Sequence, residues 1–248
     1  MPLNNLRTNN LLINTYLGIF SLLLLSGCVS QQDIPAQQKS PIDFPSSIYT
    51  EDETGSVYRV DSRASQILIS VRRGGIMASL GHDHIVASKD LQGYIFLDSN
   101  SSQNPNCRAD FYAPIANLEV DNAELRSAAN LSTSPSAKDI AGTTSNMLKS
   151  VEAADFPFAR LHSSDCLRAL SGEQSEVVLT IHGVDQQRNV AIDIEEVSEN
   201  KIILSGEFSV LQSDFGIQPF SIMNGLIKVE DRLELSYRIV ALKKLTRE

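Results

Sequence analysis

Two histidines that are close together in the sequence have the residue type and spacing to bind a metal ion. His82 and His84 flank Asp83, and in an extended strand both imidazoles project to one face with Asp83 on the other. Zinc and similar ions take three or four ligands, commonly imidazole nitrogens and carboxylate oxygens. The remaining histidines, His162 and His182, are distant in sequence. The alternative is that His82 and His84 form hydrogen bonds at the rim of the fold or to a lipid headgroup.

The sequence carries no signal for catalysis. It lacks a Gly-x-Ser-x-Gly motif, and its carboxylates are scattered over segments that are expected to face solvent. The formal net charge is −9 and no long run of Lys or Arg is present, which argues against binding to a nucleic-acid backbone. We therefore expect a protein that is not an enzyme and has no nucleic-acid partner.

Two cysteines of the central region are expected to pair. Cys107 opens one strand-like segment and Cys166 closes another, so antiparallel pairing of these segments would bring a strand start to a strand end. They are too far apart in sequence for a Cys-x-x-Cys redox motif. The alternative is two separate buried thiols.

The N-terminus has the layout of an export signal. Arg7 precedes an apolar stretch over residues 11–25, and Leu25-Ser26-Gly27-Cys28 resembles the bacterial lipobox, in which the chain is cleaved before the cysteine and the cysteine is lipidated. We expect a signal peptide over residues 1–27, then lipidated Cys28 and a flexible tether over residues 28–55. A plain signal peptide or an N-terminal membrane anchor is the alternative.

These features predict a location in the bacterial cell envelope. The protein would be lipid-anchored to a membrane through Cys28 and would face the periplasm. Val29 after the cysteine resembles the sorting pattern for the outer membrane.

Apolar and polar residues alternate along most of residues 56–248, as they do in half-buried strands. Val177, Leu179 and Ile181, for example, share one face. About eight or nine such segments occur without the rhythm of βαβ units, so we predict a mainly β fold in which eight strands close into an antiparallel barrel. Residues 121–129 and 137–150 predict two short inserted helices, which can lie across a barrel mouth.

The interior of such a barrel is either filled by side chains or holds one elongated ligand. The candidates for lining an apolar lumen are residues of one parity, and each could equally be packed core. They are Ile67, Ile69, Ile95, Phe111, Ile115, Leu179, Ile181, Ile192, Phe208 and Leu235.

Short segments in a fixed order resemble the YceI-like family over residues 56–245. They are VYRVD at 57–61, residues 65–71, QGYIFLD at 92–98, NML at 146–148, DFPF at 155–158, LTIHGV at 179–184, SDFGI at 213–217 and DRLEL at 231–235. The resemblance implies an extended, lipocalin-like antiparallel barrel in exported bacterial proteins, with a tunnel that takes long isoprenoid or fatty chains and without catalysis. His182, within one of these segments, is expected on an alternating strand as a polar partner for a neighbouring strand.

The sequence departs from the family pattern at residues 80–86. The family has a Gly-rich stretch with a Gly-x-Phe element there, whereas this chain has LGHDHIV. Because the segment is expected to border the pocket, the departure bears on which ligand is bound.

The sequence leaves three functional hypotheses. The first is a lipoprotein whose barrel binds or carries an apolar chain, such as an isoprenoid, a quinone or a fatty acyl derivative, as its lipid ligand. The second is a metal-binding or redox-partner module that uses His82 and His84 to hold a divalent metal. The third is a non-catalytic structural or envelope-stress lipoprotein with a packed barrel and a protein partner.

Overall fold

The computed structural model describes residues 39–49, 55–98 and 106–244. The chain divides into two units, Met1–Gln37 and Gln38–Glu248, and all of the described residues belong to the second. The expected signal peptide, the lipidation site Cys28 and most of the expected tether therefore lie outside the described residues. No helix among the described residues has both the length and the apolar character needed to cross a membrane.

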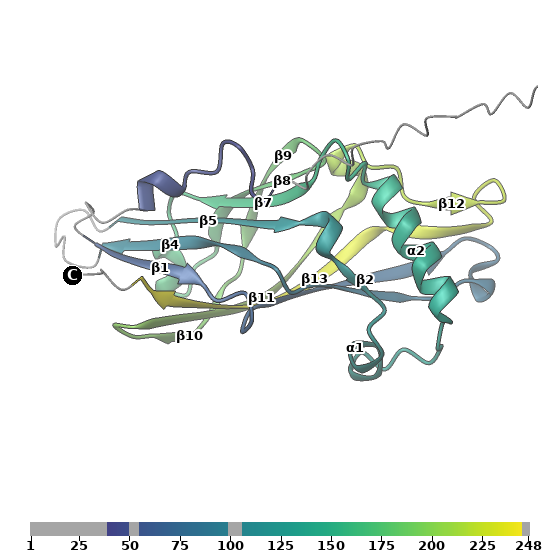
Figure 1. Ribbon diagram of the computed structural model, residues 1–248, viewed down its shortest axis with the longest axis horizontal. Coiled ribbons are helices and arrows are strands. Elements are labelled where there is room, and N and C mark those ends of the chain that lie inside the picture. The colour runs from purple at the N-terminus through teal and green to yellow at the C-terminus, as the bar shows by residue number, and fades with distance from the viewer. Residues whose placement is uncertain (1–38, 50–54, 99–105, 245–248) are drawn as a thin grey trace, which may run out of the picture. The chain divides into compact units, whose positions relative to one another are not determined.

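The described residues form mainly antiparallel β-structure, as predicted (Figure 1). The strands are β1 (Ser56–Val60), β2 (Gln66–Gly74), β3 (His84–Ser88), β4 (Gln92–Asp98), β5 (Asn106–Pro114), β6 (Glu119–Val120), β7 (Phe158–Ser163), β8 (Ser175–Ile181), β9 (Val184–Val190), β10 (Asp193–Val197), β11 (Lys201–Leu211), β12 (Ser221–Ile222) and β13 (Ile227–Lys243). The α-helices are α1 (Ala123–Ala128), α2 (Ala137–Ser150) and α3 (Leu167–Leu170), and the 3₁₀ turns are η1 (Ser46–Tyr49), η2 (Ala78–Leu80), η3 (Ile115–Asn117) and η4 (Gln212–Phe215).

The long strand β13 organises the sheet. The strands are hydrogen-bonded in the order β6-β3-β2-β13-β1-β4-β5-β7-β8-β9. One edge of β13 pairs with β11 over residues 232–242, and the other edge pairs first with β2 and then, near its end, with β1. β10 pairs with β11, and β12 pairs with β13. With its 17 residues, β13 is long enough to join two groups of strands.

The prediction of eight strands closing into a barrel is wrong in two respects. The described residues form thirteen strands in one sheet, and their pairing does not close, because β9 approaches β11 without a hydrogen-bonded ladder. The apolar alternation through Val190 and Ile194 predicts one strand, but the chain breaks it into β9 and β10. The two-residue strands β6 and β12 are too short to give a periodic pattern.

The inserted helices agree with the sequence prediction. Asn122 caps α1 by accepting hydrogen bonds from two backbone amides, and Ser136 and Asp139 form a reciprocal capping box at the start of α2. These caps explain why both helices begin where they do. Figure 1 shows α2 lying across the end of the sheet that carries β12, away from the end that carries β10.

Residues 39–49 pack on the sheet, which corrects the expected extent of the flexible tether over residues 28–55. Tyr49 is 1% exposed and its hydroxyl donates a hydrogen bond to Asp110 at 2.7 Å. Burial, reinforced by the carboxylate of Asp110, raises the pKa of the Tyr49 hydroxyl. The Phe44 ring contacts Tyr112 edge-on, with the centroids 4.7 Å apart. A Pro- and Ser-rich composition suggested a tether, but these aromatic residues give the segment enough apolar surface to bury.

The expectation that His182 lies on a strand is wrong. It lies in the tight turn between β8 and β9. Both turn residues have positive φ, 53° at His182 and 70° at Gly183, which is the backbone of a type I′ hairpin turn. The His182 ring faces Phe156, with the centroids 4.5 Å apart, and its Nδ1 is 3.1 Å from the carbonyl oxygen of Phe215. The histidine therefore ties the hairpin to η4.

We expect Gly183→Ala to lower the free energy of unfolding more than Gly172→Ala does. Both glycines have positive φ, 70° and 75°, which costs a residue with a Cβ about 1–2 kcal/mol. A Cβ on Gly183 would also lie 2.6 Å from the Phe156 ring, whereas a Cβ on Gly172 meets nothing within 4 Å. The crowding adds roughly 1–3 kcal/mol. Urea unfolding of the two variants measures this difference, and equal losses would contradict it.

Candidate apolar binding site

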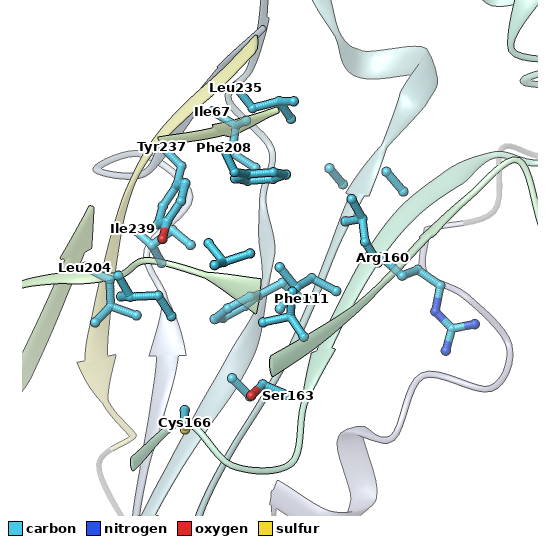
Figure 2. A pocket seen from close by; sticks show the side chains of 18 of the residues that line it. Ile67, Phe111, Arg160, Ser163, Cys166, Leu204, Phe208, Leu235, Tyr237 and Ile239 are labelled. Atoms are coloured by element: carbon cyan, nitrogen blue, oxygen red, sulfur yellow. The ribbon is translucent and has the colours of Figure 1, made fainter. Parts of the chain in front are cut away.

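The sheet encloses a cavity of about 190 Å³. Its walls come from alternate residues of β2, β4, β5, β7, β8, β11 and β13, so the inward faces predicted from the alternation meet around one space. All ten candidate residues line it: Ile67, Ile69, Ile95, Phe111, Ile115, Leu179, Ile181, Ile192, Phe208 and Leu235. Figure 2 shows Ile67, Phe111, Phe208 and Leu235 around this space. That a ligand touches them remains a prediction.

The interior is not filled by side chains. One packed cluster of buried residues includes Tyr58, Ile95 and Ile239, and a second includes Val210 and Phe215. Apolar residues such as Ile67, Leu204 and Tyr237 pack against the first cluster but stay only partly buried. Close packing would bury these three side chains fully. They stay partly exposed because they line the first cavity.

Three of the polar side chains around this first cavity, those of Arg160, Ser163 and Tyr237, are already bonded elsewhere. Arg160 is the one charged residue in its lining, which lies wholly within the described residues, and its guanidinium bonds the Asp43 carboxylate at 2.9 Å. Figure 2 shows this guanidinium directed away from the other labelled side chains. The Ser163 hydroxyl donates to the Glu176 carbonyl, and the Tyr237 hydroxyl donates to the Ala191 carbonyl. The cavity therefore presents an almost wholly apolar surface.

The predicted disulfide between Cys107 and Cys166 is present, and both cysteines line the first cavity. Cys107 lies on β5 and Cys166 follows β7, its antiparallel neighbour, so a strand start meets a strand end with the Cα atoms 5.2 Å apart. The bond therefore joins β5 to the start of α3.

We expect removal of this disulfide to lower the free energy of unfolding by about 2–4 kcal/mol, because the bond restricts a 59-residue loop in the unfolded chain. Urea unfolding with and without dithiothreitol measures the loss. The double variant Cys107→Ala/Cys166→Ala should show the same loss and no further response to dithiothreitol. An unfolding curve of the wild type that dithiothreitol leaves in place would disprove this expectation.

A second cavity of about 230 Å³ lies between α2 and the sheet. Met147 and Val151 contribute to its wall from the helix and its C-terminal end, and Phe215, Ile217 and Phe220 contribute from the segment before β13. The two cavities share six wall residues: Ile69, Ile115, Leu118, Ala159, Ile181 and Leu235. They are therefore adjacent compartments of one apolar interior.

The structure separates the two histidines that the sequence suggested as metal ligands. His84 begins β3 and lines the second cavity, whereas His82 precedes the strand and lines neither cavity. Their rings lie 6.4 Å apart. The side chain of Asp83 turns back to accept a hydrogen bond from the Arg73 amide. Among residues 39–49, 55–98 and 106–244, no three His, Cys, Asp or Glu side chains gather in a geometry that could hold a metal ion.

His84 belongs instead to a buried polar network that no sequence pattern indicates. Its Nδ1 lies 2.6 Å from Oδ2 of Asp121, and Arg126 bonds Oδ1 of the same carboxylate at 2.5 Å. The Asp121 side chain is 0% exposed and that of Arg126 is 6% exposed. Burial by itself would raise the pKa of the Asp121 carboxyl, but the hydrogen bonds from His84 and Arg126 outweigh it and hold that pKa below its usual value.

The arrangement defines a class of protein, an antiparallel β domain built around an apolar interior cavity. The YceI-like domain matches residues 58–241, and the chain belongs to this family, which confirms the resemblance seen in its segments. No curated protein matches the chain.

One solved structure supports the fold. A polyisoprenoid-binding domain from Saccharophagus degradans superposes with a TM-score of 0.51 at 12% identity, over 75% of this chain and 98% of the other. BcnA of Burkholderia cenocepacia gives a TM-score of 0.47 at 14% identity, over 73% of this chain and 98% of the other.

Proposed function

We propose that this protein binds or carries an apolar chain, such as an isoprenoid, a quinone or a fatty acyl derivative, inside its sheet and without catalysis. The observation that carries the proposal is the unfilled interior, which is lined by inward-facing aliphatic and aromatic side chains and has most of its few polar groups bonded elsewhere. The name of the Saccharophagus degradans domain, which shares this fold, supports a polyisoprenoid as one candidate ligand.

The shape of the interior favours a long ligand over a compact one. The two cavities share a wall that includes Ile69, Ala159 and Leu235, so they are adjacent. We infer that a flexible chain extends from one into the other. Each buried methylene contributes roughly 0.8 kcal/mol. Affinity should therefore rise with chain length until both cavities are occupied.

We also propose that the protein faces the periplasm from a membrane, to which lipidated Cys28 anchors it. The sequence around Leu25 to Cys28 supports this part of the proposal. The disulfide is in keeping with an oxidising compartment.

One variant tests both parts of the proposal. Expressed behind a signal peptide that is cleaved without lipidation, the chain from residue 28 onward with Cys28→Ser lacks the thiol that a lipid anchor would modify, so it should move from the membrane fraction to the soluble fraction. Purified without detergent, it should still release an apolar lipid into organic solvent, detectable by mass spectrometry. An unchanged membrane fraction would contradict the anchor, and an extract without lipid, followed by no uptake of long-chain isoprenoids, would contradict the binding role.

A further inference from the structure

The polar groups that line the second cavity gather at α2 and at the start of β3. The helix contributes Thr143, Asn146 and Ser150, and within the described residues their side chains have no hydrogen-bond partner. His84 lines it from the sheet, with 14% of its side chain exposed. Apart from Gln212, whose amide donates to the Glu230 carbonyl, the rest of the lining is apolar. The second cavity thus has polar side chains on two of its walls, at α2 and at β3.

The network behind His84 fixes which of its ring nitrogens can bind a ligand. Oδ2 of Asp121 faces Nδ1, and Oδ1 accepts from Arg126 and from the backbone amide of Ile85. Because the Asp121 carboxylate only accepts, Nδ1 carries the proton that the two groups share. Among the described residues only Nδ1 of this ring has a hydrogen-bond partner, so Nε2 is its one remaining polar atom.

Arg126 holds the Asp121 carboxylate in place. Its guanidinium balances the Asp121 carboxylate and also donates to the Thr133 carbonyl and hydroxyl and to the Asp83 carbonyl, so it is held in place from three directions. In the tautomer with the proton on Nδ1, which the contact with Asp121 favours, Nε2 is a hydrogen-bond acceptor. An acceptor in an apolar cavity selects a donor, and the donor that an apolar chain most simply carries is a hydroxyl group.

We propose that His84 Nε2 accepts a hydrogen bond from the hydroxyl head group of an apolar chain, with Asp121 and Arg126 as positioning residues and α2 covering the head group. The tail of that chain would extend past Ile69 and Leu235 into the first cavity. This inference rests on the proposed function, to which it adds the class of ligand, a long-chain alcohol such as a prenol or a quinol.

The test compares two probes that differ only at the head group. Farnesol carries a hydroxyl, and farnesyl methyl ether has the same chain without a donor. Each displaces a fluorescent naphthylamine probe from the same Cys28→Ser protein in detergent-free buffer. We expect farnesol to bind about tenfold more tightly than the ether, the effect of one hydrogen bond in an apolar site.

His84→Phe should remove this preference while leaving the affinity for the ether within about twofold, because the phenyl ring fills the space without an acceptor. The matched control is His162→Phe, because His162 also has its Nδ1 close to a buried carboxylate, at 2.9 Å from Asp110, but lies outside both cavities. This control should keep the preference. A preference for farnesol that survives in His84→Phe, or that is missing from the wild type, would overturn the inference and leave the binding role intact.

A second measurement observes the native histidines, so it does not depend on whether a His84 variant folds. The chain has four histidines, so nitrogen-15 spectra of histidine-labelled wild-type protein resolve each ring. Farnesol should shift the Nε2 resonance of His84 and the ether should not. An unmoved resonance while farnesol is bound contradicts the inference, and failure of both probes to bind overturns the inference together with the proposed function.

Discussion

Replacing Ala159 by phenylalanine is expected to abolish retention of a long apolar ligand while the domain stays folded. Ala159 lies on β7, opposite Ala113 of β5, and lines both cavities. A ring at this position would occupy the shared wall and confine any chain to one compartment. If about four methylenes lose their place, the loss is roughly 3 kcal/mol, which is at least about a hundredfold in Kd.

The measurement is the affinity for a long-chain isoprenoid probe, with lipid content after purification as a second readout. The matched control is Gln187→Phe, which adds the same ring to an exposed position on β9 that lines neither cavity. Circular dichroism and an intact disulfide would show that the Ala159 variant is folded. If the folded variant kept its affinity, the ligand would not pass Ala159 and the extended binding mode would be wrong.

Asp121→Asn is expected to lower the free energy of unfolding at neutral pH by about 3–5 kcal/mol. The substitution leaves Arg126, which is 5% exposed, without the carboxylate that balances its charge. It also weakens the bonds that join β3 to the segment before α1. Urea unfolding at pH 7 measures the loss.

The pairing of Asp121 with Arg126 also predicts how the free energy of unfolding changes with pH. The folded-state pKa of Asp121 is lowered, so its contribution to stability is present above the usual carboxyl pKa and disappears as the pH falls through the folded value. The difference in free energy of unfolding between wild type and Asp121→Asn should therefore become smaller below about pH 4. Asp139→Asn, a change at an exposed carboxylate in the α2 cap, should show no such large gap at neutral pH. If the difference between wild type and Asp121→Asn stayed constant from pH 7 into the acid range, the ionised Asp121 carboxylate would not be the source of the stabilisation.

Much of the fold and the wall of the first cavity could be predicted from local patterns. Alternation along β8 and β13 identified the inward side chains, and the caps Asn122 and Ser136 agree with the expected helices. The packed segment around Tyr49 could not be predicted in this way, because its aromatic residues have no repeating spacing and bury their surface on distant strands. The same holds for the short strands β6 and β12.

Asp121 and Arg126 were not identified from the sequence for a related reason. His84 and Asp121 are 37 positions apart, and neither residue type nor spacing links them. A lone aspartate before a short helix resembles an ordinary turn residue. Only the pairing of β3 with β6 brings the two side chains together.

The amino-acid sequence alone determined the strand faces and the family likeness, because each depends on neighbouring residues or on the order of short motifs. The tertiary structure decided that Cys107 pairs with Cys166, that the interior is hollow, that α2 covers a second cavity and that His84 is held by a buried carboxylate. These depend on distances between side chains from strands far apart in the chain, such as β2, β5 and β8. Periodicity shows which way a side chain points, and only the assembled sheet shows whether it meets another on the far side.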